Sequence, residues 1–274
     1  MSVISTNTAA NTALRYLNKN SDEQSSSLAK LSSGSRIQVA SDDASGLAVG
    51  TSLAADVAVL EQASINAQHG ESVLQTADGG LSRISDVLQR MKSLTAQSLS
   101  GAISDTERGY VDAEYQQLIA EVNAITAQTT FNGEKLLDGV GAYSTGVDFM
   151  VGTDAADKIT VTLNGVDAAT LGVAATDVTT QVNATAAMGA VDTAIGTVSA
   201  ERANVGATLS RFGYRGDVID TSLENLKAAE STLMDADIAA EQINFTNAQT
   251  LTDAAISALA RANAMPQKLL QLLN

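Results

Sequence analysis

The chain contains no cysteine and no tryptophan, only one proline and one histidine, and aromatic residues make up 3% of its 274 positions. The absence of cysteine excludes a disulfide framework. We expect the single histidine, His69, to be solvated or interfacial, and alone it cannot support nucleophilic catalysis with a serine or cysteine partner. Much of the 45% hydrophobic content is alanine, which buries little surface per residue. The composition therefore predicts long helices packed closely around a thin core.

Basic residues are also scarce, since the chain carries 16 of them against 31 acidic residues and has a net charge of −15. Nucleic acids and anionic membranes require clustered lysine and arginine, so both are excluded as main partners. We expect no stretch to reach the roughly 18 apolar residues of a membrane span. The first residues lack the basic and apolar regions of a cleaved secretory signal. The protein is therefore expected to be cytosolic or to leave the cell by an unusual route.

Both ends of the chain carry a seam, a row of positions in alternating steps of three and four residues that needs a partner helix. At the N-terminal end the seam consists of Val3, Asn7, Ala10, Leu14, Leu17, Ser21, Gln24, Leu28 and Leu31. At the C-terminal end it consists of Ile238, Glu241, Phe245, Ala248, Thr252, Ala255, Leu259, Ala262, Pro266, Leu269 and Leu273. Because each end offers one half of a coiled coil, we expect the two terminal helices to pack against each other.

Three further helices are predicted between the seams, at about 47–99, 105–128 and 179–233. Ser104 and Glu107 have capping-box spacing at the start of the second helix, which should pack antiparallel to the first. The third helix has a weak spot at 211–216, where two glycines occur. Carboxylates at the helix starts are interpreted as caps rather than ligands; these are Asp42, Asp43, Asp235 and Asp237.

A small β hairpin region is predicted at about 131–177. Asn132-Gly133 and Asp138-Gly139 are turn dipeptides that tolerate positive φ. Apolar and polar residues alternate in the two strands, which are joined around 153–157, and one strand places Ile159, Val161 and Leu163 on the same face. Because the part from 140 to 173 lies far from both seams, we expect it to face outward and to be dispensable for the fold.

The predicted fold class is mainly α, with long antiparallel helices, coiled-coil-like paired termini and a small β hairpin region in the middle. No grouping of residues predicts a catalytic site, a cofactor site or a metal site, and the tripeptide Arg215–Asp217 is a chance match to an adhesion motif. Two classes of function fit this pattern. One is a self-assembling structural subunit whose seams are covered by neighbours, and the other is a coiled-coil adaptor or signalling protein. An enzyme is a distant third.

Several long blocks of the chain resemble the bacterial flagellins. They include "LSSGSRIQVASDDASGLAVG" at 31–50, "YQQLIAEVNAITAQTTFNGEKLLDG" at 115–139, and "ESTLMDADIAAEQINFTNAQTLTDAAISALARANAMPQKLLQLL" at 230–273. The resemblance covers roughly residues 1–140 and 200–274, and the short, acidic, alanine-rich style is similar to the small flagellins of α-proteobacteria. It implies a structural subunit of the flagellar filament, a homopolymer used for swimming motility.

The resemblance also implies a domain organisation. Residues 1–33 and 236–274 are expected to form an inner core coiled-coil domain, with 34–46 as a linker. Residues 47–235 are expected to form an outer core helical domain that contains the hairpin region. Only about fifty residues separate the "FNG" block from the next helix, so the large outer domains of many flagellins are expected to be absent or vestigial.

By the same resemblance, the protein is expected to be extracellular, in the bacterial flagellum, and exported unfolded through the type III apparatus without a cleaved signal. Its implied partners are other copies of itself, an export chaperone, the filament cap and hook-junction proteins. The expected polymer contacts are Val3, Leu14, Leu17, Leu28, Leu31, Ile238, Phe245, Leu259, Leu269, Leu270, Leu272 and Leu273.

One segment, 88–98, is similar to the part of flagellins that a vertebrate Toll-like receptor reads. Arg90 and Leu94 match that segment, whereas Ser93 stands where enterobacterial relatives carry a glutamate. The resemblance thus marks Arg90 and Leu94 as receptor-segment residues, with one charged contact missing.

Overall fold

The computed structural model describes the backbone of residues 7–273 and the side chains of residues 7–265. Its long helices are α1 (Thr8–Ser33), α2 (Ala44–Leu99), α3 (Asp105–Gln128), α5 (Gln181–Met234) and α6 (Ile238–Leu273), and one short helix is α4 (Ala142–Thr145). The strands are β1 (Thr130–Phe131), β2 (Glu134–Lys135), β3 (Val147–Met150) and β4 (Lys158–Val161). The predicted mainly α fold is confirmed, with helix ends within three residues of those expected.

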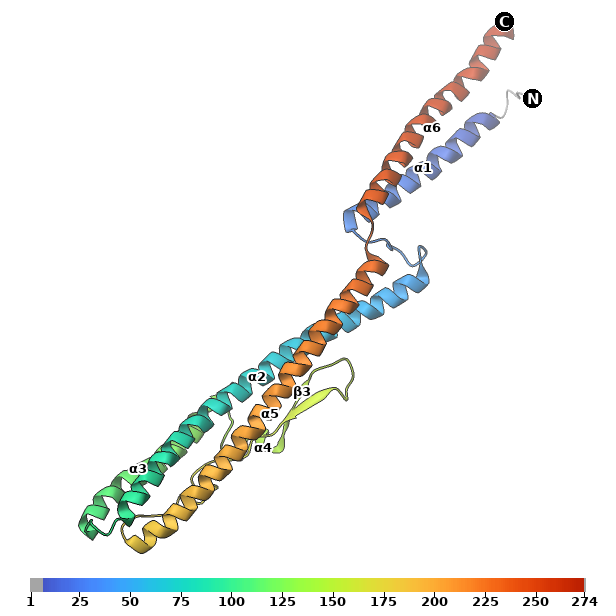
Figure 1. Cartoon of the computed structure of the whole chain (residues 1–274). Helices are drawn as coiled ribbons and strands as arrows, with labels where there is room; N and C mark the ends of the chain where they lie inside the picture. The colour runs from blue at the N-terminus through green and yellow to red at the C-terminus, as the bar shows by residue number, and fades with distance from the viewer. Residues whose placement is uncertain (1–6, 274) are drawn as a thin grey trace. The chain divides into compact units, whose positions relative to one another are not determined.

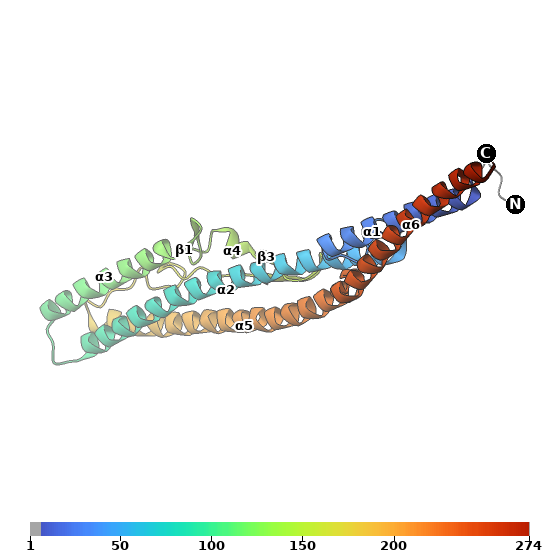
Figure 2. The ribbon, with the colours of Figure 1, turned by 90° about the horizontal axis from the view of Figure 1, so that it is seen from above.

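The chain divides into two units, one made of residues 1–56 and 225–274 and the other of residues 57–224. In the first unit, α1 and α6 run side by side (Figure 1). In the second, α2, α3 and α5 lie next to one another, and the segment between α3 and α5 packs along them (Figure 2). The second unit holds the large buried side chains, including Tyr115, Phe212, Leu81, Leu88 and Met91.

Helix α5 is continuous, so the weak spot predicted at 211–216 is wrong. The reason is tertiary packing around Phe212, whose side chain is fully buried. Its ring meets Phe149 of β3 edge to face, with centroids 5.8 Å apart. On the other side it approaches Gly70 of α2 so closely that a Cβ there would lie 2.5 Å from the ring. This packing outweighs the low helix propensity of the two neighbouring glycines.

The predicted hairpin is confirmed, since β3 and β4 pair antiparallel with Val147 opposite Val161 and Met150 opposite Lys158. A second, smaller hairpin pairs β1 with β2 around Asn132 and Gly133, which have φ values of 50° and 82°. The turn dipeptide at this place thus supplies the positive φ values that a two-residue hairpin loop requires.

The expectation that the region from 140 to 173 faces outward is wrong for most of its apolar residues. Ile159, Val161 and Leu163 are buried on one face as their alternation predicted. Later apolar residues of the segment are buried as well, namely Val166, Ala168, Leu171 and Val173. The loop at 153–156 is exposed, as are single residues such as Val140. The segment therefore supplies part of the core of the second unit, because its apolar face finds cover against the long helices.

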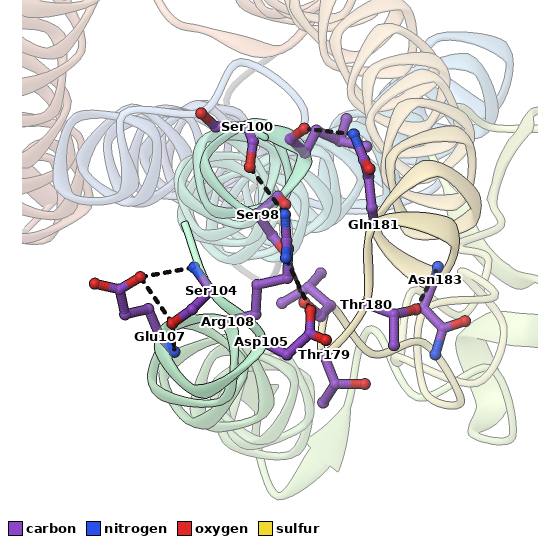
Figure 3. Close-up of polar contacts among 12 residues, drawn as sticks. Ser98, Ser100, Ser104, Asp105, Glu107, Arg108, Thr179, Thr180, Gln181 and Asn183 are labelled. Atoms are coloured by element: carbon purple, nitrogen blue, oxygen red, sulfur yellow. Dashed lines mark hydrogen bonds and ion pairs between the residues drawn. The ribbon is translucent and has the colours of Figure 1, made fainter. Parts of the chain in front are cut away.

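The turn between α2 and α3 is held by Arg108, whose side chain is only 8% exposed (Figure 3). Its guanidinium donates to the carbonyl oxygens of Ser98 (2.8 Å) and Ser100 (2.9 Å) and pairs with Asp105 (2.9 Å). These contacts satisfy carbonyl groups that the end of α2 leaves without a helical partner. The capping box of Ser104 and Glu107 at the start of α3 is confirmed.

The start of α5 is joined to the same end of the unit. The hydroxyl of Ser98 donates to the carbonyl oxygen of Val178 (2.6 Å), and the amide of Gln181 donates to that of Leu99 (3.1 Å). Hydrogen bonds from Thr179 and Asn183 lower the pKa of Asp177. Together these bonds fasten the end of the irregular segment to α2, so the three long helices are fixed at this end.

Mutations at buried positions of the hairpin region should destabilise the protein, whereas mutations in its exposed loop should not. Leu163→Ala should reduce the free energy of unfolding by about 2–5 kcal/mol, because it leaves a cavity at a buried site. Replacing 153–156 with a Gly-Ser loop should change the free energy of unfolding by less than about 1 kcal/mol, provided that Asp157, which pairs with Arg215, is kept. Urea unfolding followed by circular dichroism measures both. A Leu163→Ala variant as stable as the wild type would contradict a core role for the segment.

Candidate assembly surface

Two connections hold the first unit together where α1 and α6 begin their pairing. Gly34 ends α1 with a φ of 74°, which suits glycine at a helix C-terminus. Ser35 then forms an antiparallel bridge with Asp235, and the backbone N–H of Ala236 donates to the carbonyl of Gly34 (2.8 Å). The segments 34–36 and 234–236 are thus hydrogen-bonded to each other, which sets the point from which the two helices run together.

Two of the four predicted carboxylate caps, Asp43 and Asp237, are confirmed, whereas Asp42 accepts the N–H groups of Gln38 and Val39 in the preceding loop instead. Asp43 accepts the N–H of Gly46 (2.8 Å) at the start of α2, and Asp237 accepts the N–H groups of Ala239 (2.9 Å) and Ala240 (3.1 Å) at the start of α6. These acidic residues are therefore occupied in capping. No group of three potential ligands occurs among the described residues that could hold a metal ion.

The α6 half of the seam follows the predicted spacing through the residues whose side chains are described. Its buried and half-buried positions are Glu241, Phe245, Ala248, Thr252, Ala255, Leu259 and Ala262. Only Ile238, at the helix start, departs from the prediction, because its side chain is 52% exposed. The rest of this seam, at 266, 269 and 273, lies outside the described side chains.

The α1 half of the seam differs from the prediction at every second step. The covered positions are Asn7, Ala10, Ala13, Leu17, Asn20, Gln24, Ser27 and Leu31, so Ala13, Asn20 and Ser27 replace the expected Leu14, Ser21 and Leu28. Both sets have helical spacing, but the small side chains allow α1 and α6 to approach closely, as Ala248 and Ala255 do on the facing helix. Leu14 and Leu28 therefore lie beside the seam.

The consequence is a pair of helices with a small and partly polar interface and exposed apolar flanks. Leu14 and Leu28, fourteen residues apart and hence on the same side of α1, are 45% and 55% exposed. On α6, Ile238 and Ile256 are eighteen residues apart, which is five turns, and each is 52% exposed. We call these residues, with Leu251, the apolar flanks. These side chains are the candidate contacts with another protein chain.

Of the other predicted contacts, Leu17, Leu31, Phe245 and Leu259 are half-buried in the seam. Val3 lies outside the described residues, and the side chains of four more lie outside the described part of the chain, namely Leu269, Leu270, Leu272 and Leu273. Sequence reasoning missed Leu251 and Ile256, whose exposure depends on where the seam lies.

Helix α2 adds an apolar stretch that the sequence reading did not expect. An 18-residue window with a mean hydropathy of 1.3 makes this helix long and apolar enough to cross a membrane, by length and composition alone, and 22% of the window is buried. Val49 and Val59 near the start of α2 are about half exposed. A single such helix is weak support for a membrane span, and the same exposed apolar residues suit contact with another protein chain.

The two receptor-segment residues occupy different environments in α2. Leu94 is buried in the second unit, at 1% exposure, whereas Arg90 lies on the surface and forms an ion pair with Glu114 of α3 (2.6 Å). Arg90 is therefore available to a partner only if that pair rearranges. His69, as expected, is exposed.

Two family models match this chain. The first is described as the bacterial flagellin N-terminal helical region and matches residues 4–142, and the second is described as the bacterial flagellin C-terminal helical region and matches residues 188–273. Together they cover most of the chain and leave out residues 143–187, which include the β3–β4 hairpin and the first turns of α5.

Similar proteins of known role cover the whole chain. A flagellin from Halalkalibacterium halodurans is 37% identical over 273 residues, with 99% of both chains covered. The flagellar filament 30.7 kDa core protein of Treponema maltophilum is 34% identical, covering 99% of this chain and 100% of that protein. The crystal structure of Bacillus cereus flagellin, at 27% identity and a TM-score of 0.52, covers 61% of this chain and 94% of that one.

Substitutions in the apolar flanks should weaken self-association without changing the stability of the isolated chain. Leu14→Ala and Leu28→Ala should leave thermal unfolding of the isolated chain nearly unchanged, within about 0.5 kcal/mol each, because both side chains are half-exposed. The same changes should weaken self-association, which sedimentation measures. Ser21→Ala, at an exposed polar position between them, is the matched control and should associate normally. If the leucine variants associated as the wild type does, the flanks would not be contacts.

Proposed function

We propose how this chain, which belongs to the bacterial flagellin family and is a structural subunit of the flagellar filament, assembles with its own copies. Residues 1–33 and 236–274 form the inner core of the filament, 34–46 is the linker, and 47–235 forms the outer core. Assembly proceeds by axial stacking of the terminal helices and side-by-side packing of the longer helices. The filament is extracellular, and its subunits act by polymerising.

The single observation that carries this proposal is the exposure of the apolar flanks beside a seam of small and polar residues. Ordering the backbone of the terminal helices costs about 1–2 kcal/mol per residue. The seam buries only a few side chains of modest size, among them Ala248, Ala255 and Ser27. Because each exposed leucine or isoleucine contributes about 1.5–3 kcal/mol when covered, neighbouring subunits supply the missing burial.

The polymer contacts proposed on the inner core are Leu14, Leu17, Leu28, Leu31, Ile238, Phe245 and Leu259, together with Val3 and the four leucines after Pro266. Leu17, Leu31, Phe245 and Leu259 act through the α1–α6 seam, which places the flanks in register. The exposed valines at the start of α2 extend the contact surface, so the apolar character of that stretch serves packing between copies.

Delivery and capping of the filament involve further partners in this proposal. The chain is exported without a cleaved signal through the type III apparatus, held until then by an export chaperone. At the ends of the filament it meets the cap and the hook-junction proteins. None of these steps uses catalysis by this chain, whose role is mechanical. Its short middle segment and acidic composition favour placing it with the small flagellins of α-proteobacteria.

For the vertebrate receptor, we propose that Arg90, of the two matching residues, is the one that a partner contacts, once its ion pair with Glu114 rearranges. Leu94 contributes by holding α2 in place, because its side chain is in the core. Ser93 supplies no charge at the position where a glutamate is expected, which weakens recognition.

Deletion of 266–274 should leave a soluble, helical monomer that forms no filaments. The segment holds four leucines, whose burial by neighbours is worth about 6–12 kcal/mol per subunit as an upper estimate. Half of that shifts an association constant by several powers of ten. Circular dichroism reports the helices of the monomer, and electron microscopy with sedimentation reports filaments. Normal filaments from the truncated chain would refute this role, and a misfolded monomer would assign the segment to folding.

Protease protection should differ between the monomer and the filament. In the monomer, mild digestion should remove about the first and last 40 residues and spare 50–230, because the ends lack their packing partners. In the filament the same bonds should be protected. Mass spectrometry of the fragments measures both states, and equal protection in the two would contradict the proposal.

A further inference from the structure

A cationic cleft lies between β4 and α5 in the second unit. It has a volume of about 340 Å³ and is lined by Lys158, Ile159, Arg211, Tyr214, Arg215 and Val218. Three of its six residues are basic in a chain that has only 16 basic residues in all. Tyr214 and Val218 are 74% and 53% exposed, while Ile159 forms a buried floor. The cleft therefore combines positive charge with exposed apolar and aromatic surface.

Two of the three cations already have partners within the chain, and the third does not. Lys158 pairs with Asp148 across the hairpin, and Arg215 pairs with Asp157 at the end of the loop. These pairs fix the hairpin against α5. Arg211 forms no ion pair with any residue that the structure describes, and its side chain is exposed. It is therefore the cation available to an outside carboxylate.

The four α5 residues of the cleft lie on one face of the helix. Arg211, Tyr214, Arg215 and Val218 are spaced by three, four and seven residues, so together they extend over about 10 Å of the helix axis. Such a row is the footprint of a partner helix rather than of a small anion. A partner helix that matches it needs acidic residues together with an apolar or aromatic side chain at the same spacing.

Helix α3 of the same chain has that pattern on its outer face. It contains five acidic residues and one basic residue, and the basic one, Arg108, is turned inward to the α2–α3 turn (Figure 3). Glu107, Tyr110, Glu114 and Glu121 follow steps of three, four and seven, and all four are exposed. By comparison, α2 carries five acidic and three basic residues over more than twice the length.

Hydrogen bonds hold the first turn of α3 in a conformation that keeps the carboxylate of Glu107 in place. The backbone N–H and the hydroxyl of Ser104 both donate to Glu107, and these bonds lower the pKa of its carboxyl. Glu107 is therefore ionised at neutral pH. Tyr110, one turn further along the helix, is 74% exposed, as is Tyr214 in the cleft.

We propose that the cationic cleft on α5 and β4 of one subunit receives the acidic face of α3 from a second copy. Charge complementarity is the argument: copies with a net charge of −15 repel each other, so contact favours the one arrangement that sets a cationic face against an acidic one. The inference rests on the filament assembly described above and assigns its lateral contact. Arg211 is the specificity-determining residue, and Glu114 exchanges between Arg90 and the neighbour.

Photo-crosslinking tests which surfaces meet in the filament. Tyr214 is replaced by p-benzoylphenylalanine in isotopically light chains, which are copolymerised with heavy wild-type chains and irradiated. Mass spectrometry should find light-to-heavy crosslinks between position 214 and residues 105–128. The reciprocal replacement at Tyr110 should give crosslinks to 211–218. Crosslinks confined to one chain, or leading to another helix of the neighbour, would overturn the proposal.

Charge variants of Arg211 give an independent measurement. Arg211→Glu should raise the critical concentration for filament growth about tenfold, and Arg211→Lys should stay within about twofold of the wild type. The defect of Arg211→Glu should shrink in about 1 M salt, where screening acts over about 3 Å. Circular dichroism should be unchanged, because the side chain is exposed.

Arg83→Glu is the matched control, since Arg83 is an exposed arginine on α2 of the same unit whose charge change is identical. It should leave the critical concentration near that of the wild type. Equal defects in the two variants would overturn the proposal by assigning the effect to net charge alone. A wild-type chain that forms no filaments in the same buffer would instead contradict the assembly on which the inference rests.

Discussion

The narrow seam between α1 and α6 is the constraint on which the function of this flagellin depends. Two helices that meet through Ala13, Ser27, Ala248 and Ala255 approach closely but bury little apolar surface. Leu14, Leu28, Ile238, Leu251 and Ile256 are left on the flanks, half-exposed. Such a pair is stabilised by neighbours rather than by itself, because burial of apolar surface is the main favourable term in folding. In the proposed mechanism, incomplete cover in the monomer drives assembly.

The second unit follows the opposite rule and covers its own apolar residues. Fully buried side chains line α2, α3 and α5, and the segment between α3 and α5 adds Leu163 and its neighbours to the same core. Phe212 fits against Gly70 so closely that a Cβ at that position would force the ring to shift. Polar bonds around Arg108 and Ser98 fix the end of the unit. A unit that is stable alone can present fixed surfaces to its neighbours.

Charge decides how such surfaces meet. An excess of acidic residues keeps separate copies soluble and apart, and it makes any cationic face a specific feature. In the second unit Lys158, Arg211 and Arg215 lie together beside the hairpin, whereas Glu107, Glu114 and Glu121 are exposed on α3. In the proposed assembly, apolar burial on the first unit and charge complementarity on the second supply affinity and register through different physical terms.

The sequence alone determined the helices, their caps and the hairpin, because local periodicity and capping chemistry act over a few residues; α3 runs from Asp105 to Gln128 as Ser104 and Glu107 indicate. It also determined the α6 seam from Glu241 to Ala262. It did not determine that Leu14 and Leu28 lie beside the α1 seam, since two adjacent rows have the same spacing and only the facing helix selects one. Tertiary packing likewise carried α5 through its glycines at Phe212 and drew the hairpin region into the core, because burial against distant residues outweighs local propensity.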